Sequence, residues 1–149
     1  MTIMNCPARS NIKNRGIRAQ ADFTLACGLP YIHHDGLGFD AGSDVEYNGQ
    51  HISVKSYHFT LMSGPMCEGK TTLPEIWDVF ARRAHSNLFA YIVKEKAYIM
   101  DKAEFHEFVL RFCEIERESS HSDRQGTGSF KVRARRNENA MIKWFESHI

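Results

Sequence analysis

The chain has 149 residues, of which 42% are hydrophobic and 25% charged, and its formal net charge is +1. These values are typical of a globular protein that can bury a core, so we expect one domain over residues 1–149. No apolar run approaches the roughly 18 residues that a membrane-spanning helix needs, which excludes a helical membrane span and predicts no membrane partner.

The N-terminus lacks the apolar stretch of a signal peptide, and the cysteines lie far apart in the sequence. Widely spaced cysteines without a Cys-x-x-Cys motif argue against a zinc site and against a disulfide framework. We therefore expect a cytoplasmic protein with reduced thiols at Cys6, Cys27, Cys67 and Cys113.

Basic residues are concentrated in two segments, although the net charge is small. Residues 1–21 contain four basic residues and no acidic one, and the segment 131–136, KVRARR, holds four more. Separated basic patches suit contact with a polyanion, and an ordinary solvated surface is the alternative.

The first predicted helix covers about residues 14–27 and follows a loose segment, residues 1–13. Ile17, Ala21 and Leu25 recur at four-residue spacing, which is the period of one helix face. A glycine follows this helix, and the glycine-rich residues 28–43 are typical of a turn-rich connection.

A β-hairpin is predicted for residues 44–55, with Asn48-Gly49 at its tip, because both residues tolerate a positive φ. In this register Asp44 lies opposite Ser53. Side chains alternate along a strand, so one face of the hairpin is apolar and the other is polar. The apolar face consists of Val45, Tyr47, Ile52 and Val54, and the polar face of Asp44, Glu46, His51, Ser53 and Lys55.

The rest of the chain is predicted to alternate strands and helices. Capping boxes at Thr72-x-x-Glu75 and Asp101-x-x-Glu104 start two of the helices. The expected elements up to residue 100 are a strand continuing to about Met62, a helix over 73–85, and strands 88–93 and 97–100 joined by a short charged turn. A helix from Asp101 to about Glu118 follows, with an apolar stripe of Phe105, Phe108, Val109 and Phe112. The chain is then expected to form a flexible loop over 119–129, a strand from Phe130 and a final helix capped by Asn137.

The hairpin resembles the PD-(D/E)xK nuclease pattern, in which an acidic residue opens one strand and a lysine lies on the next. The run DVEYNGQHISVKS is similar to the catalytic hairpin of small type II restriction endonucleases, and the resemblance covers roughly residues 36–112. It implies an α/β (mixed α+β) fold with a restriction-endonuclease-like core, in which a central mixed β-sheet with antiparallel hairpins is flanked by helices. It also implies an intracellular protein of bacterial or phage origin.

The same resemblance implies a Mg²⁺ site, with Mn²⁺ as the alternative ion. It assigns the first metal ligand to Asp44, the positioning of the attacking water to Lys55, and a further ligand to the backbone carbonyl of Val54. Asp40 competes for the first acid, but Asp44 is favoured because it falls opposite Ser53.

The chain departs from the family at the second acid. The family has Glu or Asp two residues before the lysine, whereas this chain has Ser53. Glu46, on the same predicted face, is the best internal substitute. A helix before the hairpin often supplies an extra acid in this family. The candidates here are Gln20 and Asp22, and Asp22 is expected to be a polar surface residue.

A second motif suggests a different function. Residues 64–71, GPMCEGKT, match the GxxxxGK[ST] phosphate-binding motif and resemble the P-loop of nucleotide kinases. A P-loop needs its helix to begin at the lysine, whereas the capping box places the helix start at Leu73, with Pro74 in the first turn. A nucleotide-binding kinase or ATPase using Lys70 and Thr71 stays an alternative, as does a DNA-binding module with a decayed active site.

We therefore predict a metal-dependent endonuclease that hydrolyses phosphodiester bonds in double-stranded DNA at a specific site, as a restriction or homing enzyme. Such a short chain cuts both strands by pairing with copies of itself, so a homodimer or homotetramer is expected. The residues expected to contact DNA are Lys70, Lys131, Arg133, Arg135 and Arg136.

Overall fold

The computed structural model describes residues 1–31, 44–56, 58–63, 70, 72–117, 129–134 and 138–149. The chain divides into two compact units. The first unit consists of Met1–Ser56, His85–Lys102 and His148–Ile149, and the second of Tyr57–Ala84 and Ala103–Ser147. Both contain helices and strands, so the protein is a mixed α+β protein with four helices in the described part.

The first unit is built on a five-stranded sheet. Its strands are β1 (Thr2–Asn5), β2 (Asp44–Tyr47), β3 (Gln50–Lys55), β5 (Leu88–Val93) and β6 (Lys96–Asp101), in the order β1-β6-β5-β3-β2. β3 and β5 run parallel, and the other neighbours run antiparallel. This confirms the expected mixed sheet with antiparallel hairpins, while the restriction-endonuclease-like core stays a prediction.

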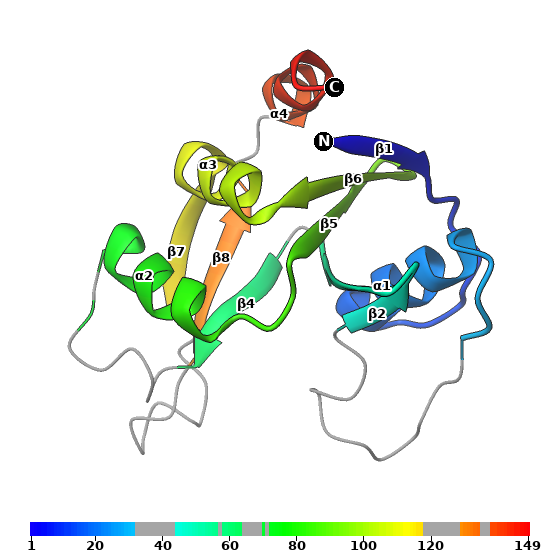
Figure 1. Ribbon diagram of the computed structural model, residues 1–149, viewed down its shortest axis with the longest axis horizontal. Coiled ribbons are helices and arrows are strands. Elements are labelled where there is room, and N and C mark those ends of the chain that lie inside the picture. The colour runs from blue at the N-terminus through cyan, green and yellow to red at the C-terminus, as the bar shows by residue number, and fades with distance from the viewer. Residues whose placement is uncertain (32–43, 57, 64–69, 71, 118–128, 135–137) are drawn as a thin grey trace. The chain divides into compact units, whose positions relative to one another are not determined.

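Helix α1 (Arg15–Ala26) covers one face of this sheet and has the expected boundaries. The side chain of Asn14 caps it by accepting a hydrogen bond from the backbone N–H of Ile17 at 3.1 Å. The helix ends before Gly28, whose φ of 77° is the left-handed conformation typical of a helix end. Figure 1 shows the ribbon of α1 beside β2. Phe23 of α1 is fully buried in a core with residues of four strands and of the segment after β1; this core contains Cys6, Phe23, Val45, Ile52, Ala90 and Ala97.

The prediction that residues 1–13 are loose is wrong for Thr2–Asn5, which form β1 against β6. The tight turn between β5 and β6 also holds the segment that follows β1. Glu95 accepts a hydrogen bond from the backbone N–H of Cys6 through its carbonyl, at 2.9 Å, and one from that of Ala8 through Oε1, at 3.1 Å. A long-range partner strand, invisible in the local sequence, therefore orders the N-terminus.

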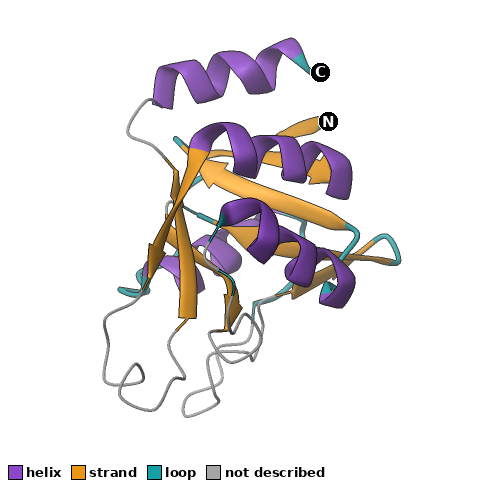
Figure 2. Ribbon diagram, turned by 90° about the vertical axis from the view of Figure 1, so that its left-hand side faces the viewer, coloured by secondary structure: helices purple, strands orange, loops and turns teal. Residues whose placement is uncertain are grey.

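The second unit contains a three-stranded antiparallel sheet of β4 (His58–Ser63), β8 (Ser129–Ala134) and β7 (Cys113–Arg117), in that order (Figure 2). Two predictions are wrong here. The strand expected to run from the hairpin to Met62 is two strands in two different sheets. The helix expected to reach Glu118 ends at Phe112, because Cys113 and Ile115 alternate with glutamates and pair with β8 as a strand.

Three helices belong to this unit: α2 (Leu73–Arg83), α3 (Lys102–Phe112) and α4 (Glu138–Ser147). Aromatic side chains join them to the sheet. The ring centroid of Phe105 on α3 lies 5.9 Å from that of Phe59 on β4, and Phe108 lies 5.3 Å from Phe145 on α4. The predicted apolar stripe of α3 is confirmed as core, since Phe105, Phe108 and Val109 are fully buried.

Candidate functional site

The hairpin of β2 and β3 forms as the Asn-Gly motif predicts. Asn48 and Gly49 have φ angles of 53° and 75°, the pair of positive values that a two-residue turn requires. The strands pair with Asp44 opposite Ser53 and Glu46 opposite His51, so the predicted register is confirmed. The register fixes which residues share a face of the ribbon.

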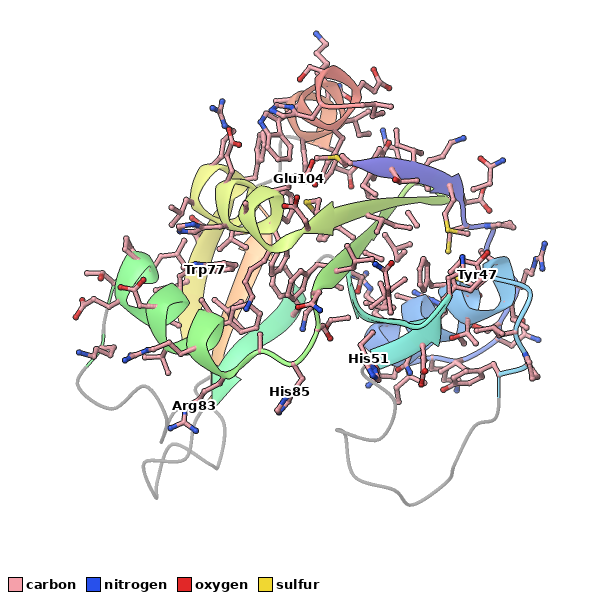
Figure 3. All side chains as sticks on the ribbon, viewed as in Figure 1. Tyr47, His51, Trp77, Arg83, His85 and Glu104 are labelled. Atoms are coloured by element: carbon pink, nitrogen blue, oxygen red, sulfur yellow. The ribbon has the colours of Figure 1, made fainter. Side chains whose placement is uncertain are left out.

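The two faces of the hairpin differ as expected, with one exception. Val45 and Ile52 are buried on the face that α1 covers. On the opposite face Glu46 and His51 are exposed. Ser53 is the exception, because only 6% of it is exposed although it belongs to the polar face. Tyr47 and His51, labelled in Figure 3, leave opposite faces of the ribbon.

Asp44, Ser53 and Lys55 occupy positions on one face of the sheet. Asp44 opens β2 directly opposite Ser53, and Lys55 follows two residues later on β3, where side chains return to the same face. The side chain of Asp44, and Asp40 as a whole, lie outside what the structure describes. Glu46 is the more distant candidate, because its partner His51 lies four residues from Lys55, about 13 Å along an extended strand.

Sequence reasoning missed the neighbours that β5 adds to this site, at the edge of β3 opposite to β2. In the parallel pairing with β5, Ser53 is the partner of Phe89 and Lys55 the partner of Tyr91. Phe89 is 1% exposed and Tyr91 is 2% exposed. Lys55 therefore lies where the polar part of the face meets an apolar part, and poor solvation strengthens any charge interaction that it makes. A parallel partner strand leaves no local signal in the hairpin sequence.

Helix α1 does not add an acid to this face. It packs on the opposite, Val45–Ile52 face, so neither Gln20 nor Asp22 lies beside Lys55. The expectation of a surface Asp22 is wrong. This residue is 6% exposed, and its Oδ1 accepts hydrogen bonds from the backbone N–H groups of Arg9 at 3.0 Å and Ser10 at 2.9 Å.

The helix start that argues against a P-loop is confirmed. Thr72 caps α2, its side chain accepts from the backbone N–H of Glu75, and the Glu75 carboxylate accepts from the backbone N–H of Thr72. Pro74 lies in the first turn. Lys70 is exposed and precedes the cap, so it does not open the helix. Most of the motif, residues 64–69 and Thr71, lies outside the described residues.

The described part of the basic segment 131–136 lies on β8, and acidic positions of β7 pair with two of its basic positions. Lys131 pairs with Glu116 of β7, and Arg133 pairs with Glu114. Opposite charges at directly opposed positions of antiparallel strands attract each other. These four positions carry no net charge, which weakens the attraction of this sheet for a polyanion. Arg135 and Arg136 lie outside the described residues.

No cluster of three or more His, Cys, Asp or Glu side chains that could hold a metal ion occurs within the described residues. In the same part of the chain, no helix is both long and apolar enough to cross a membrane. The chain matches no protein-family model, no curated protein and no solved structure.

Proposed function

We propose that the protein is a Mg²⁺-dependent endonuclease that hydrolyses phosphodiester bonds in double-stranded DNA, with its active site on the polar face of the β2–β3 hairpin. The observation that carries the proposal is the register, which puts the positions of Asp44, Ser53 and Lys55 on one face of the sheet. The resemblance to PD-(D/E)xK nucleases adds the chemistry.

The donor set fits magnesium better than zinc. Mg²⁺ retains several waters and binds through one or two carboxylates together with substrate phosphates, whereas zinc sites use three or four His, Cys or carboxylate side chains. The hairpin offers the Asp44 carboxylate, the Ser53 hydroxyl and the Val54 carbonyl. Mn²⁺ has similar preferences for oxygen ligands and is the expected substitute.

Each residue of the site has a separate task. When bound, the metal ion neutralises charge on the scissile phosphate and lowers the pKa of a bound water. Asp44 and the Val54 carbonyl would hold that ion, and the Ser53 hydroxyl would hydrogen-bond to a water bound to it. Lys55 orients the attacking water and stabilises the extra negative charge of the transition state. The buried Phe89 and Tyr91 exclude water beside Lys55, which strengthens that stabilisation.

Two copies of the chain acting together would cut both DNA strands. A two-fold homodimer, or a homotetramer of paired dimers, matches a palindromic target of the restriction or homing type. Lys70, Lys131, Arg133, Arg135 and Arg136 are the residues assigned to DNA contact under this proposal.

A second candidate function follows from Ser53. A buried serine at the position of the second acid removes one ligand carboxylate, and a DNA-binding module that no longer cleaves would tolerate that loss. It predicts DNA binding without cleavage in either Mg²⁺ or Mn²⁺. The start of α2 at Leu73 speaks against the kinase or ATPase alternative, in which ATP binding would depend on Lys70.

The test is cleavage of plasmid and phage DNA by the wild type and by the variants Asp44→Asn and Lys55→Ala. Each variant is expected to lose about 10²- to 10⁴-fold in rate, because each removes a group that acts on the reacting atoms. Matched controls are Asp78→Asn on α2 and Lys143→Ala on α4, which are exposed and expected to cut at the wild-type rate. Equal cutting by all five proteins would refute the site assignment.

Ser53→Asp distinguishes the two candidates. It restores the acid that the family places two residues before the lysine. If the protein is an active nuclease or a decayed one, Ser53→Asp lowers the Mg²⁺ concentration needed for cleavage or creates cleavage where the wild type has none. If neither the wild type nor Ser53→Asp cuts in Mg²⁺ or Mn²⁺, the hairpin is not a nuclease site.

A further inference from the structure

The N-terminal part of the first unit carries an unbalanced positive charge. Residues 1–31 contain four basic residues and a single acidic one, Asp22. Arg9, Lys13 and Arg15 are exposed and Arg18 is half-buried. Asp22 is buried and accepts two backbone hydrogen bonds, so its carboxylate does not face solvent beside these cations.

Asp22 also brings Arg9 to the helix that carries two of the other cations. Arg15, Arg18 and Asp22 follow the i, i+3, i+7 spacing of one helix stripe. Because Asp22 holds the backbone of Arg9, Arg9 lies at the far end of the stripe from Arg15. Three arginines are thus distributed along about 10 Å of α1, the length of seven helical residues.

A described neighbour of this segment is also basic on balance. The β5–β6 turn, which contacts the segment between β1 and α1, consists of Lys94 and Glu95, and Lys96 opens β6; all three residues are exposed. The Glu95 carboxylate accepts a hydrogen bond from the backbone N–H of Ala8. These three residues therefore add a net charge of +1 beside the four basic residues of the N-terminal segment.

We propose that this surface, formed by Arg9, Lys13, Arg15 and Arg18 and called the α1 basic surface, binds the phosphate backbone of double-stranded DNA without regard to sequence. The inference rests on the proposed function for its substrate. Arginine forks bind phosphate through paired hydrogen bonds, which suits a site where three of four cations are arginines. The N-terminus of α1 adds its own partial positive charge at Arg15.

The side-chain composition distinguishes DNA from a membrane as the partner. A helix that lies on a membrane buries large apolar side chains beside its basic ones. The exposed large hydrophobic residues in the described part of the chain are Leu110 and Ile149, and both lie outside this surface. A basic surface without large exposed apolar side chains suits sequence-independent binding to the DNA backbone.

The test measures DNA binding without divalent metal, by fluorescence anisotropy of a labelled duplex over a series of salt concentrations. The double variant Arg9→Gln, Arg18→Gln is compared with the control Arg111→Gln, Lys143→Gln, which removes the same charge from exposed positions on α3 and α4. The first is expected to bind at least about tenfold more weakly. Its plot of log affinity against log salt is expected to be less steep by about 0.9 for each phosphate that the variant no longer neutralises. The control is expected to bind like the wild type.

The outcomes separate this inference from the proposed function. If the double variant keeps the wild-type affinity and salt dependence, or if the wild type binds no duplex, the α1 basic surface is overturned, whatever the cleavage assay gives. If binding depends on Arg9 and Arg18 but the wild type cuts no DNA in Mg²⁺ or Mn²⁺, this inference stands and the nuclease proposal fails. Equal loss of affinity in both double variants would show a net-charge effect and would also overturn it.

Discussion

Replacing Asp22 with alanine is expected to destabilise the first unit by about 3 kcal/mol. The carboxylate is 6% exposed and accepts hydrogen bonds from the backbone N–H groups of Arg9 and Ser10, at 3.0 and 2.9 Å. A hydrogen bond to a charged group contributes about 1.5–3 kcal/mol, so the two together contribute about 3–6 kcal/mol. Arg9 is exposed and Ser10 partly so, and water will replace some of the missing hydrogen bonds, which favours the lower value.

Two further variants show whether the hydrogen bonds are responsible. Asp22→Asn retains a carbonyl oxygen for both donors but loses the charge, so it is expected to cost about 1 kcal/mol. Asp78→Ala removes an exposed aspartate from α2 and is expected to change stability by less than about 0.5 kcal/mol.

The assay is urea denaturation followed by far-UV circular dichroism, combined with hydrogen exchange at the backbone amides of Arg9 and Ser10. Both tryptophans, Trp77 and Trp144, belong to the second unit, so their fluorescence reports on that unit separately. In Asp22→Ala the two amides are expected to exchange at rates close to those of an unprotected chain. An unfolding free energy within about 0.5 kcal/mol of the wild type, or unchanged protection of both amides, would refute the reasoning.

Three other predictions follow from local geometry. Burial, with the charge of Asp22 adding to it, raises the pKa of the Cys6 thiol from 9.0 to about 12, so the folded chain holds this proton more tightly than the unfolded one. Above about pH 9 the unfolding free energy of the wild type is therefore expected to fall more steeply with pH than that of Cys6→Ala, by about 1.4 kcal/mol per pH unit. Denaturation of both proteins at each pH measures this, and parallel pH profiles would contradict it. Gly49→Ala is expected to lower the stability of the protein by about 1 kcal/mol because of its φ of 75° alone, since no atom lies within 4 Å of the added Cβ. Gly16→Ala in helix α1 is expected not to lower it, and thermal melting of both variants measures the difference. Thr72→Ala is expected to cost about 1 kcal/mol by urea denaturation while Thr72→Ser costs less than half of that, and equal losses would show that the cap hydroxyl is not responsible.

The sequence predicts those parts of the fold that depend on neighbouring residues. The Asn48-Gly49 turn, with its positive φ angles, determines the hairpin register, and that register positions Asp44 opposite Ser53. The capping box at Thr72 likewise sets the start of α2. In each case the deciding groups lie within a few residues of one another, so a local pattern contains the information.

The features that the sequence does not reveal depend on distant partners. β7 follows α3 without a break and becomes a strand because β8 pairs with it. Tyr91 comes to lie beside Lys55 only through the parallel pairing of β3 with β5. Asp22 looks like a surface residue of α1 until the segment at Arg9 folds back over it. The part of the candidate site that lies within the hairpin is therefore predictable from the sequence, and the part that β5 contributes is not.

The path of the chain between its two units restricts how the protein can be divided. The first unit needs both Met1–Ser56 and His85–Lys102. The second unit needs Tyr57–Ala84 and Ala103–Ser147, which lie before and after His85–Lys102 in the chain. A fragment that stops at Ser56 has no β5 to cover the edge of β3, and therefore lacks the strand that contributes Tyr91 to the site. During synthesis β3 has an open edge until β5 has left the ribosome, so premature termination anywhere before β5 should yield an aggregation-prone product instead of a smaller working protein.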